Sequence, residues 1–76
     1  MADVIIDARG LSCPLPVLKA RRALREMPAG GTAEVLSTDP NSLEDFPSFC
    51  HAAGHELLEA TQVEDAFRFV IKKGQD

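Results

Sequence analysis

Two closely spaced prolines mark the point at which a strand must give way to a helix near the start of the chain. Val4-Ile5-Ile6 is a β-branched run that is typical of a strand, and apolar residues recur at helical spacing after Pro16. Pro14 and Pro16 suit the first turn of a helix, where a backbone N–H has no intrahelical partner. The sequence therefore predicts a strand over residues 3–8, a tight loop over 9–12 and a helix over 14–27.

Cys13 directly precedes this helix, at a place where a Ser or Asp cap commonly stands. Because the two prolines carry no N–H, the N–H groups of Leu15 and Val17 are expected near its sulfur. Hydrogen bonds from these groups and the positive end of the helix dipole would lower the pKa of the thiol. Arg9 is expected to stabilise the thiolate further, with Asp7 positioning the guanidinium. We predict that Cys13 is a reactive thiol.

The rest of the chain shows one more helical pattern and three more strand patterns. We expect strands over residues 32–38, 55–61 and 66–72, and a helix over 40–53 that is capped by Asp39 and ended by Gly54. Pro47 leaves two alternatives for this helix. Either the helix kinks there, or residues 40–44 form a separate turn and Asp45 caps a new helix.

The order β-α-β-α-β-β predicts an α/β (α+β) two-layer sandwich, with two helices packed on one face of a four-stranded mixed sheet. A chain of 76 residues is expected to form a single domain, over residues 1–76. The helical faces predicted to be buried are Val17, Ala20, Ala23, Leu24 and Met27 in the first helix and Leu43, Phe46, Phe49, Cys50 and Ala53 in the second.

Composition narrows the class of protein. Hydrophobic residues make up 45% and charged residues 26%, which indicates a globular domain rather than a disordered one. The net charge of −4 argues against nucleic acid as a direct partner. No apolar run is long enough to cross a bilayer, and the first residues show no export signal. We therefore expect a cytoplasmic protein with no membrane partner, and a monomer.

The remaining cysteine is predicted to be structural, and the two histidines are predicted to form no metal site. Cys50 lies on the apolar face of the second helix, so a structural thiol is expected, and the alternative is a resolving or accessory sulfur. His51 and His55 are four residues apart, but Gly54 is expected to end the helix between them. No further ligands follow at a zinc spacing. We expect no metal and no cofactor.

The outer side of the first helix offers a candidate docking patch for a partner protein. Leu15 and Leu18 are placed away from the core by the helical period, beside Lys19 and Arg22. Two outward leucines ringed by cations next to the thiol suit a protein interface. The alternative is an ordinary solvated helix face, because single surface leucines are common.

The segment Asp7-Ala8-Arg9-Gly10-Leu11-Ser12-Cys13-Pro14-Leu15-Pro16 resembles the Cys-Pro-x-Pro signature of the TusA (SirA-like) sulfur-carrier proteins. The likeness continues through later segments at matching spacing and spans essentially the whole chain. These segments are Thr38-Asp39-Pro40, Asp45-Phe46-Pro47-Ser48-Phe49-Cys50, Gly54-His55-Glu56-Leu57 and Phe69-Val70-Ile71-Lys72-Lys73-Gly74.

This resemblance implies the same sandwich fold and a sulfur carrier that holds sulfane sulfur as a persulfide on Cys13. The implied partners are a donor protein, either a cysteine desulfurase or a rhodanese-like protein, and an acceptor protein. The implied pathways are tRNA thiolation, molybdenum-cofactor supply and sulfur metabolism. Such a protein is a carrier-type sulfurtransferase rather than a small-molecule enzyme with many turnovers. The alternative is a small regulatory protein-binding module in which Cys13 is a redox switch or is unused.

Overall fold

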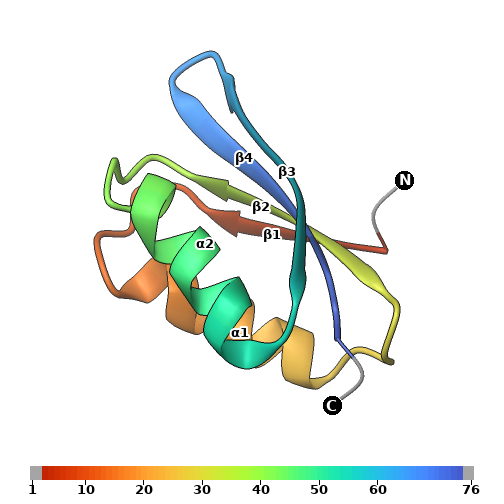
Figure 1. Cartoon of the computed structure of the whole chain (residues 1–76). Helices are drawn as coiled ribbons and strands as arrows, with labels where there is room; N and C mark the ends of the chain where they lie inside the picture. Colours follow the sequence, from red (N-terminus) through yellow and green to blue (C-terminus); the bar gives the residue numbers. More distant parts are fainter. Residues whose placement is uncertain (1–2, 75–76) are drawn as a thin grey trace.

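Strands and helices alternate in the order that the sequence predicts. The computed structural model describes residues 3–74, and the predicted domain of residues 1–76 includes four residues, 1–2 and 75–76, that lie outside this range. The elements are β1 (Val4–Ala8), α1 (Leu15–Arg25), β2 (Thr32–Ser37), α2 (Ser42–Ala53), β3 (Glu56–Val63) and β4 (Ala66–Lys72) (Figure 1).

The four strands form one mixed sheet in the order β1-β2-β4-β3. β1 and β2 are parallel neighbours, which is possible because α1 carries the chain back between them. β4 pairs antiparallel with both β2 and β3. Both helices cover the same face of the sheet, as Figure 1 shows. The predicted two-layer sandwich is therefore confirmed.

The core lies between the sheet and the two helices. Phe46 of α2 stacks on Phe69 of β4, with ring centroids 4.6 Å apart, and both side chains are fully buried. Leu24 of α1 and Ile71 of β4 are buried with them. This packing fixes both helices against the central strands, so the loops that enter the helices are also fixed.

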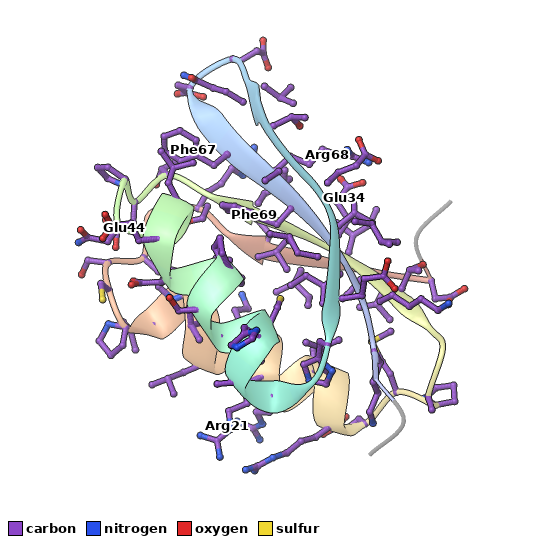
Figure 2. All side chains as sticks on the ribbon, in the orientation of Figure 1. Arg21, Glu34, Glu44, Phe67, Arg68 and Phe69 are labelled. Atoms are coloured by element: carbon purple, nitrogen blue, oxygen red, sulfur yellow. The ribbon has the colours of Figure 1, made fainter. Side chains whose placement is uncertain are left out.

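On the opposite face of the sheet, ion pairs connect neighbouring strands. Arg68 follows Phe67 and precedes Phe69 in β4, so its side chain points away from the helices (Figure 2). Its guanidinium forms ion pairs with Glu34 of β2 at 3.1 Å and with Glu59 of β3 at 3.3 Å. These contacts tie three neighbouring strands together on the face that no helix covers.

The first turn of α2 differs from the prediction. Residues 40 and 41 form a turn, and the helix begins at Ser42 with Asn41 as its N-cap. The helix then runs without a break through Pro47, which is exposed, so the predicted alternative of a separate turn and a second cap at Asp45 is wrong. Pro47 lies on the solvent side, where water can reach the carbonyl that its missing N–H leaves free.

Two residues of the predicted α2 core face are exposed. Leu43 is 51% exposed because Ser42 takes the inward position, one helical turn before Phe46. Ala53 is exposed at the end of the helix. In α1, Ala20 and Leu24 are buried as predicted, whereas Val17 is only half-buried.

Candidate functional site

Cys13 lies exposed in the loop between β1 and α1. Helix α1 begins at Leu15 with Pro14 as the N-cap residue, so the cysteine stands one position before the cap. The N–H of Leu15 donates to the carbonyl oxygen of Ser12 at 2.9 Å. The expected cap role of Cys13 and the expected bond from Leu15 to its sulfur are therefore wrong.

The loop that carries Cys13 is bonded to the loop between β2 and α2. The N–H of Cys13 donates to Oδ2 of Asp39 at 2.6 Å, and the N–H of Gly10 donates to Oγ1 of Thr38 at 2.9 Å. Gly10 has a φ of 82°, which favours glycine. Both loops follow the carboxyl ends of the parallel strands β1 and β2, so they meet at one edge of the sheet.

The Asp39 carboxylate is itself held in place. Its Oδ1 accepts the N–H of Asn41 at 3.1 Å, and its own N–H donates to Oγ of Ser37 at 3.2 Å. The Ser37 hydroxyl also lies 2.7 Å from the Ser42 hydroxyl, and both side chains are buried. This chain of polar contacts joins the end of β2, the start of α2 and the backbone of Cys13.

The local charges oppose a thiolate at Cys13. Hydrogen bonding with the Asp45 carboxylate raises the pKa of the Cys13 thiol above its usual value, and desolvation and the charges of Asp45 and Asp39 act in the same direction. The predicted lowering of this pKa is therefore wrong. The helix end and the residues next to Cys13 favour a thiolate, whereas the opposing carboxylates come from α2 and the loop before it.

Arg9 does not act as the predicted partner of the sulfur. Its guanidinium donates two hydrogen bonds to the Asp7 carboxylate, from Nε to Oδ1 at 2.9 Å and from Nη2 to Oδ2 at 3.0 Å. This contact lowers the pKa of the Asp7 carboxyl to about 2. Asp7 does position Arg9, as expected, but it holds the guanidinium on itself.

Comparisons with known proteins assign this arrangement to a family. The sequence model described as Sulfurtransferase TusA matches residues 4–73. The chain belongs to the TusA family. A sulfur carrier protein TusA from Allochromatium vinosum is 44% identical over 71 residues, which cover 93% of each chain. One from Pseudomonas putida is 42% identical over 74 residues, 97% of this chain and 92% of that protein.

A solved structure supports the TusA fold directly. The crystal structure of a SirA-like protein from Desulfitobacterium hafniense is 30% identical to this chain, with a TM-score of 0.81. The match covers 93% of this chain and 97% of the other. The Cys13-Pro14-Leu15-Pro16 segment lies within the part of the chain that matches the TusA family model.

The structure brings part of the predicted docking patch of this TusA-family domain to the surface. Leu15 is 48% exposed and Leu18 is 47% exposed on α1, as expected, and Arg22 is also exposed. Lys19 is exposed as well, but its Nζ donates to the carbonyl oxygen of Asp7 at 2.6 Å. The lysine therefore holds α1 to the end of β1 instead of extending freely from the patch.

The second cysteine of this TusA-family chain is structural in its setting, as predicted. Cys50 is 2% exposed in the core, and burial raises its pKa to about 11. His51 and His55 are separated by Gly54, which ends α2 with a φ of 80°. Nδ1 of His55 accepts the N–H of Gly74 at 3.0 Å. Within residues 3–74 no group of three His, Cys, Asp or Glu side chains is placed to hold a metal ion.

Sequence reasoning missed the two carboxylates that face Cys13. The sequence pattern marks Asp39 only as a helix cap and Asp45 only as a possible second cap. Both aspartates lie in segments that carry the TusA resemblance, and this resemblance is the sequence signal that could have pointed to them. Neither α1 nor α2, the two helices of the described chain, is long and apolar enough to cross a membrane.

Proposed function

We propose that this protein is a sulfur carrier of the sulfurtransferase type, with Cys13 as the persulfide-bearing residue. The observation that carries the proposal is an exposed free cysteine in the Cys-Pro-x-Pro segment of a chain that belongs to the TusA family. Relatives that match over more than nine-tenths of the chain are named sulfur carrier protein TusA, which supports the same function class. Cys50 is too deeply buried to serve as the carrier sulfur.

The chemistry needs no oxidant or reductant. The Cys13 thiolate attacks the outer sulfur of a persulfide on a donor protein. A new S–S bond forms on Cys13 as the donor's S–S bond breaks, and the donor thiolate leaves with the bonding electron pair. The proton released from Cys13 balances the charge of that leaving thiolate. An acceptor thiolate then attacks the outer sulfur of the Cys13 persulfide, and Cys13 leaves in the same way.

The two carboxylates next to Cys13 destabilise the loaded carrier relative to the free thiol. They favour the neutral thiol over the thiolate at rest. An ionised persulfide on Cys13 carries its negative charge in the same neighbourhood and meets the same repulsion. Asp39 and Asp45 therefore favour delivery of the sulfur to an acceptor over its retention on the carrier.

Partner proteins must reach Cys13 for this exchange to occur. The exposed leucines at positions 15 and 18, with Arg22 beside them, form the docking patch that we propose, and they follow Cys13 along α1. A small apolar contact ringed by charge suits a brief complex. We propose a cysteine desulfurase or a rhodanese-like protein as donor and a thiol protein as acceptor. The acceptor pathway is tRNA thiolation, molybdenum-cofactor supply or sulfur metabolism, in the cytoplasm, with the carrier as a monomer.

The raised pKa of Cys13 favours one alternative. A thiol that resists ionisation at rest also suits a regulatory binding module in which Cys13 is a redox switch or is unused. The two functions differ in whether Cys13 gains sulfur. A carrier is loaded and unloaded by protein partners, whereas a module binds its partner without sulfur transfer.

The test is loading followed by mass spectrometry. The protein is incubated with a rhodanese and thiosulfate, or with a cysteine desulfurase and L-cysteine. We expect a gain of one sulfur atom that is lost in Cys13→Ser and kept in Cys50→Ala, and that a thiol acceptor removes. A Cys13→Ser protein that still gains sulfur would place the carrier residue elsewhere. Failure of the wild-type protein to gain sulfur from either donor would favour the regulatory module.

A further inference from the structure

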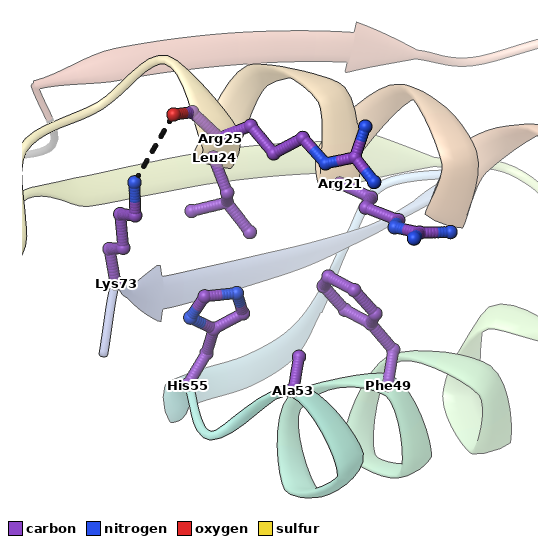
Figure 3. A pocket seen from close by; sticks show the side chains of 7 residues that line it. All are labelled: Arg21, Leu24, Arg25, Phe49, Ala53, His55 and Lys73. Carbon is purple, nitrogen blue, oxygen red and sulfur yellow. Dashed lines mark hydrogen bonds between the residues drawn. The ribbon is translucent and has the colours of Figure 1, made fainter. Parts of the chain in front are cut away.

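A pocket lies apart from the Cys13 loop, at the other end of the helix pair. It has a volume of about 300 Å³ and is walled by α1, the end of α2, and the residues that follow α2 and β4 (Figure 3). This volume is at the lower end of the range for small-molecule sites. None of the residues that line it carries an acidic side chain.

Cations dominate the lining, although the chain as a whole has a net charge of −4. Arg21 and Arg25 are one helical turn apart on α1, and Figure 3 shows both on the side of the pocket opposite α2. Lys73 adds a third charge from the end of β4. The ion pairs found within residues 3–74 involve none of these three side chains. No carboxylate within residues 3–74 therefore neutralises the two guanidinium groups.

Two of the polar groups are fixed before any ligand binds. Nζ of Lys73 donates to the carbonyl oxygens of Arg25 and Met27, the first of which is the dashed line in Figure 3. Nδ1 of His55 accepts the Gly74 N–H, so the proton of the neutral ring is on Nε2. In Figure 3 this second ring nitrogen points into the pocket. It offers a neutral donor beside the cations.

The remaining walls are apolar and partly flat. Leu24 is buried at the back of the pocket, and the Phe49 ring lies against the His55 ring, with centroids 5.6 Å apart at an angle of 53°. A hollow lined by Val17, Leu18 and Ala52 continues from Phe49 along the two helices. A simple hydrated ion would leave these surfaces unused, whereas an organic anion would cover them.

We propose that this pocket binds a small organic carboxylate that carries a flat apolar group. The carboxylate lies on the guanidinium groups of Arg21 and Arg25, which match a planar carboxylate in shape and charge. The apolar group packs against Phe49 and Leu24, and Nε2–H of His55 is within the same pocket. The site does not include Cys13, so this proposal and the sulfur-carrier proposal can each fail without the other.

Benzoate is the probe, titrated into the ¹⁵N-labelled full chain while amide chemical shifts are recorded. We expect saturable shifts at Ala53, Gly54 and His55. Benzamide has nearly the same shape without the charge, and acetate has the charge without the ring, so both should bind at least about tenfold more weakly. Inorganic phosphate tests whether any anion suffices. Phosphate binding as tight as that of benzoate would overturn the organic ligand class.

Matched arginine variants locate the site. Arg21→Gln and Arg25→Gln should each weaken benzoate binding about tenfold, because a charged hydrogen bond is lost. Arg22→Gln removes another exposed cation from the same helix, outside the pocket, and should leave the affinity for benzoate unchanged. Each spectrum also shows whether the variant is folded. Equal binding of benzamide, equal weakening by Arg22→Gln, or shifts that do not saturate would each overturn the proposal.

Discussion

The backbone N–H of Cys13 donates a hydrogen bond of 2.6 Å to Oδ2 of Asp39, a residue 26 positions later in the sequence. The same carboxylate accepts the N–H of Asn41 at the start of α2. The Asp39 side chain therefore holds the Cys13 loop and the start of the second helix together. Helix α2 supplies Asp45 as the second carboxylate near the sulfur. The positions of these two carboxylates beside Cys13 contribute to the raised pKa of its thiol.

Replacement of Asp45 by Asn should lower the pKa of Cys13. The change removes the negative charge and the carboxylate hydrogen bond that raise this pKa, so more thiolate is present at any pH below it. Alkylation by iodoacetamide, followed as a function of pH, should show a midpoint at lower pH and a several-fold faster reaction near neutrality. Glu56→Gln, at an exposed position at the start of β3, is the control and should leave the curve in place. An unchanged curve for Asp45→Asn would mean that Asp45 does not govern the thiol.

The same substitution should shift the partition of sulfur. An ionised persulfide on Cys13 is destabilised by the neighbouring carboxylates, so removal of one charge should favour the loaded carrier. At equilibrium with glutathione persulfide and glutathione, mass spectrometry should show a several-fold higher ratio of loaded to unloaded protein for Asp45→Asn than for wild type. A lower ratio would show that the carboxylates stabilise the bound sulfur instead of promoting its release.

The buried serine pair supports the loop that carries Asp39. Ser37→Ala leaves the Ser42 hydroxyl buried without its partner at 2.7 Å and also removes the acceptor of the Asp39 N–H. We expect a loss of about 1–3 kcal/mol in the free energy of unfolding, measured by urea denaturation. Ser37→Ala with Ser42→Ala should lose less than the sum of the two single changes, because neither hydroxyl is then left unpaired. Additive losses would show that the two hydroxyls do not interact.

The ion pair between Asp7 and Arg9 predicts that the Asp7 carboxyl titrates at a lower pH than usual. Arg9 holds the pKa of the Asp7 carboxyl at about 2, below its ordinary value of 3.8. A lowered pKa in the folded state contributes stability that is fully present above the ordinary value and is lost as the pH falls towards 2. Carboxyl NMR titration of Arg9→Gln should show the Asp7 midpoint rising towards its ordinary value, with little change in overall stability because both side chains are exposed. A midpoint that stays near 2 would assign the shift to another group.

Local pattern is sufficient to predict the fold and the place of Cys13 between β1 and α1. The β-branched run before Gly10 and the alternation of Phe67, Phe69 and Ile71 each report on a single element. The period of apolar residues in α1 likewise predicts a single element, and Ala20 and Leu24 on its predicted inner face are buried. Patterns of this kind depend on neighbours within about one helical turn, so the sequence contains them directly.

The electrostatics of the site could not be predicted in this way. The pKa of Cys13 depends on Asp45, which is 32 positions away and reaches the sulfur only through the packing of α2 on the sheet. The exposure of Leu43 likewise depends on Ser42, whose hydroxyl is held inside by Ser37. In both cases a tertiary contact overrides a local expectation. To predict the charges near Cys13 from sequence, one would need to know that the loop after β1 bonds to the loop after β2. The period of apolar residues carries no information on that contact.

Docking of partner proteins should be separable from the chemistry of the sulfur. Leu15 and Leu18 are about half exposed on the first two turns of α1. Sulfur exchange brings two sulfur atoms into contact, so the surface around Cys13 must lie in the interface. We predict that Leu15→Gln with Leu18→Gln slows sulfur transfer from a protein donor several-fold, because the complex loses its apolar contact. The free energy of unfolding should change by only about 0.5 kcal/mol per site, as is usual for exposed positions.

Two measurements keep this docking prediction specific. Alkylation of Cys13 by iodoacetamide should be nearly unchanged in the double variant, since the carboxylates that control the thiol are untouched. Leu58→Gln is the matched control, because this leucine is 44% exposed but lies on the edge strand β3, away from α1. Transfer from the protein donor should proceed at the wild-type rate in Leu58→Gln. The donor interface would lie on another surface if Leu58→Gln slowed transfer equally, or if the Leu15/Leu18 variant accepted sulfur at the wild-type rate. Either outcome would be decisive, because the sulfur itself would be equally reactive in all three proteins.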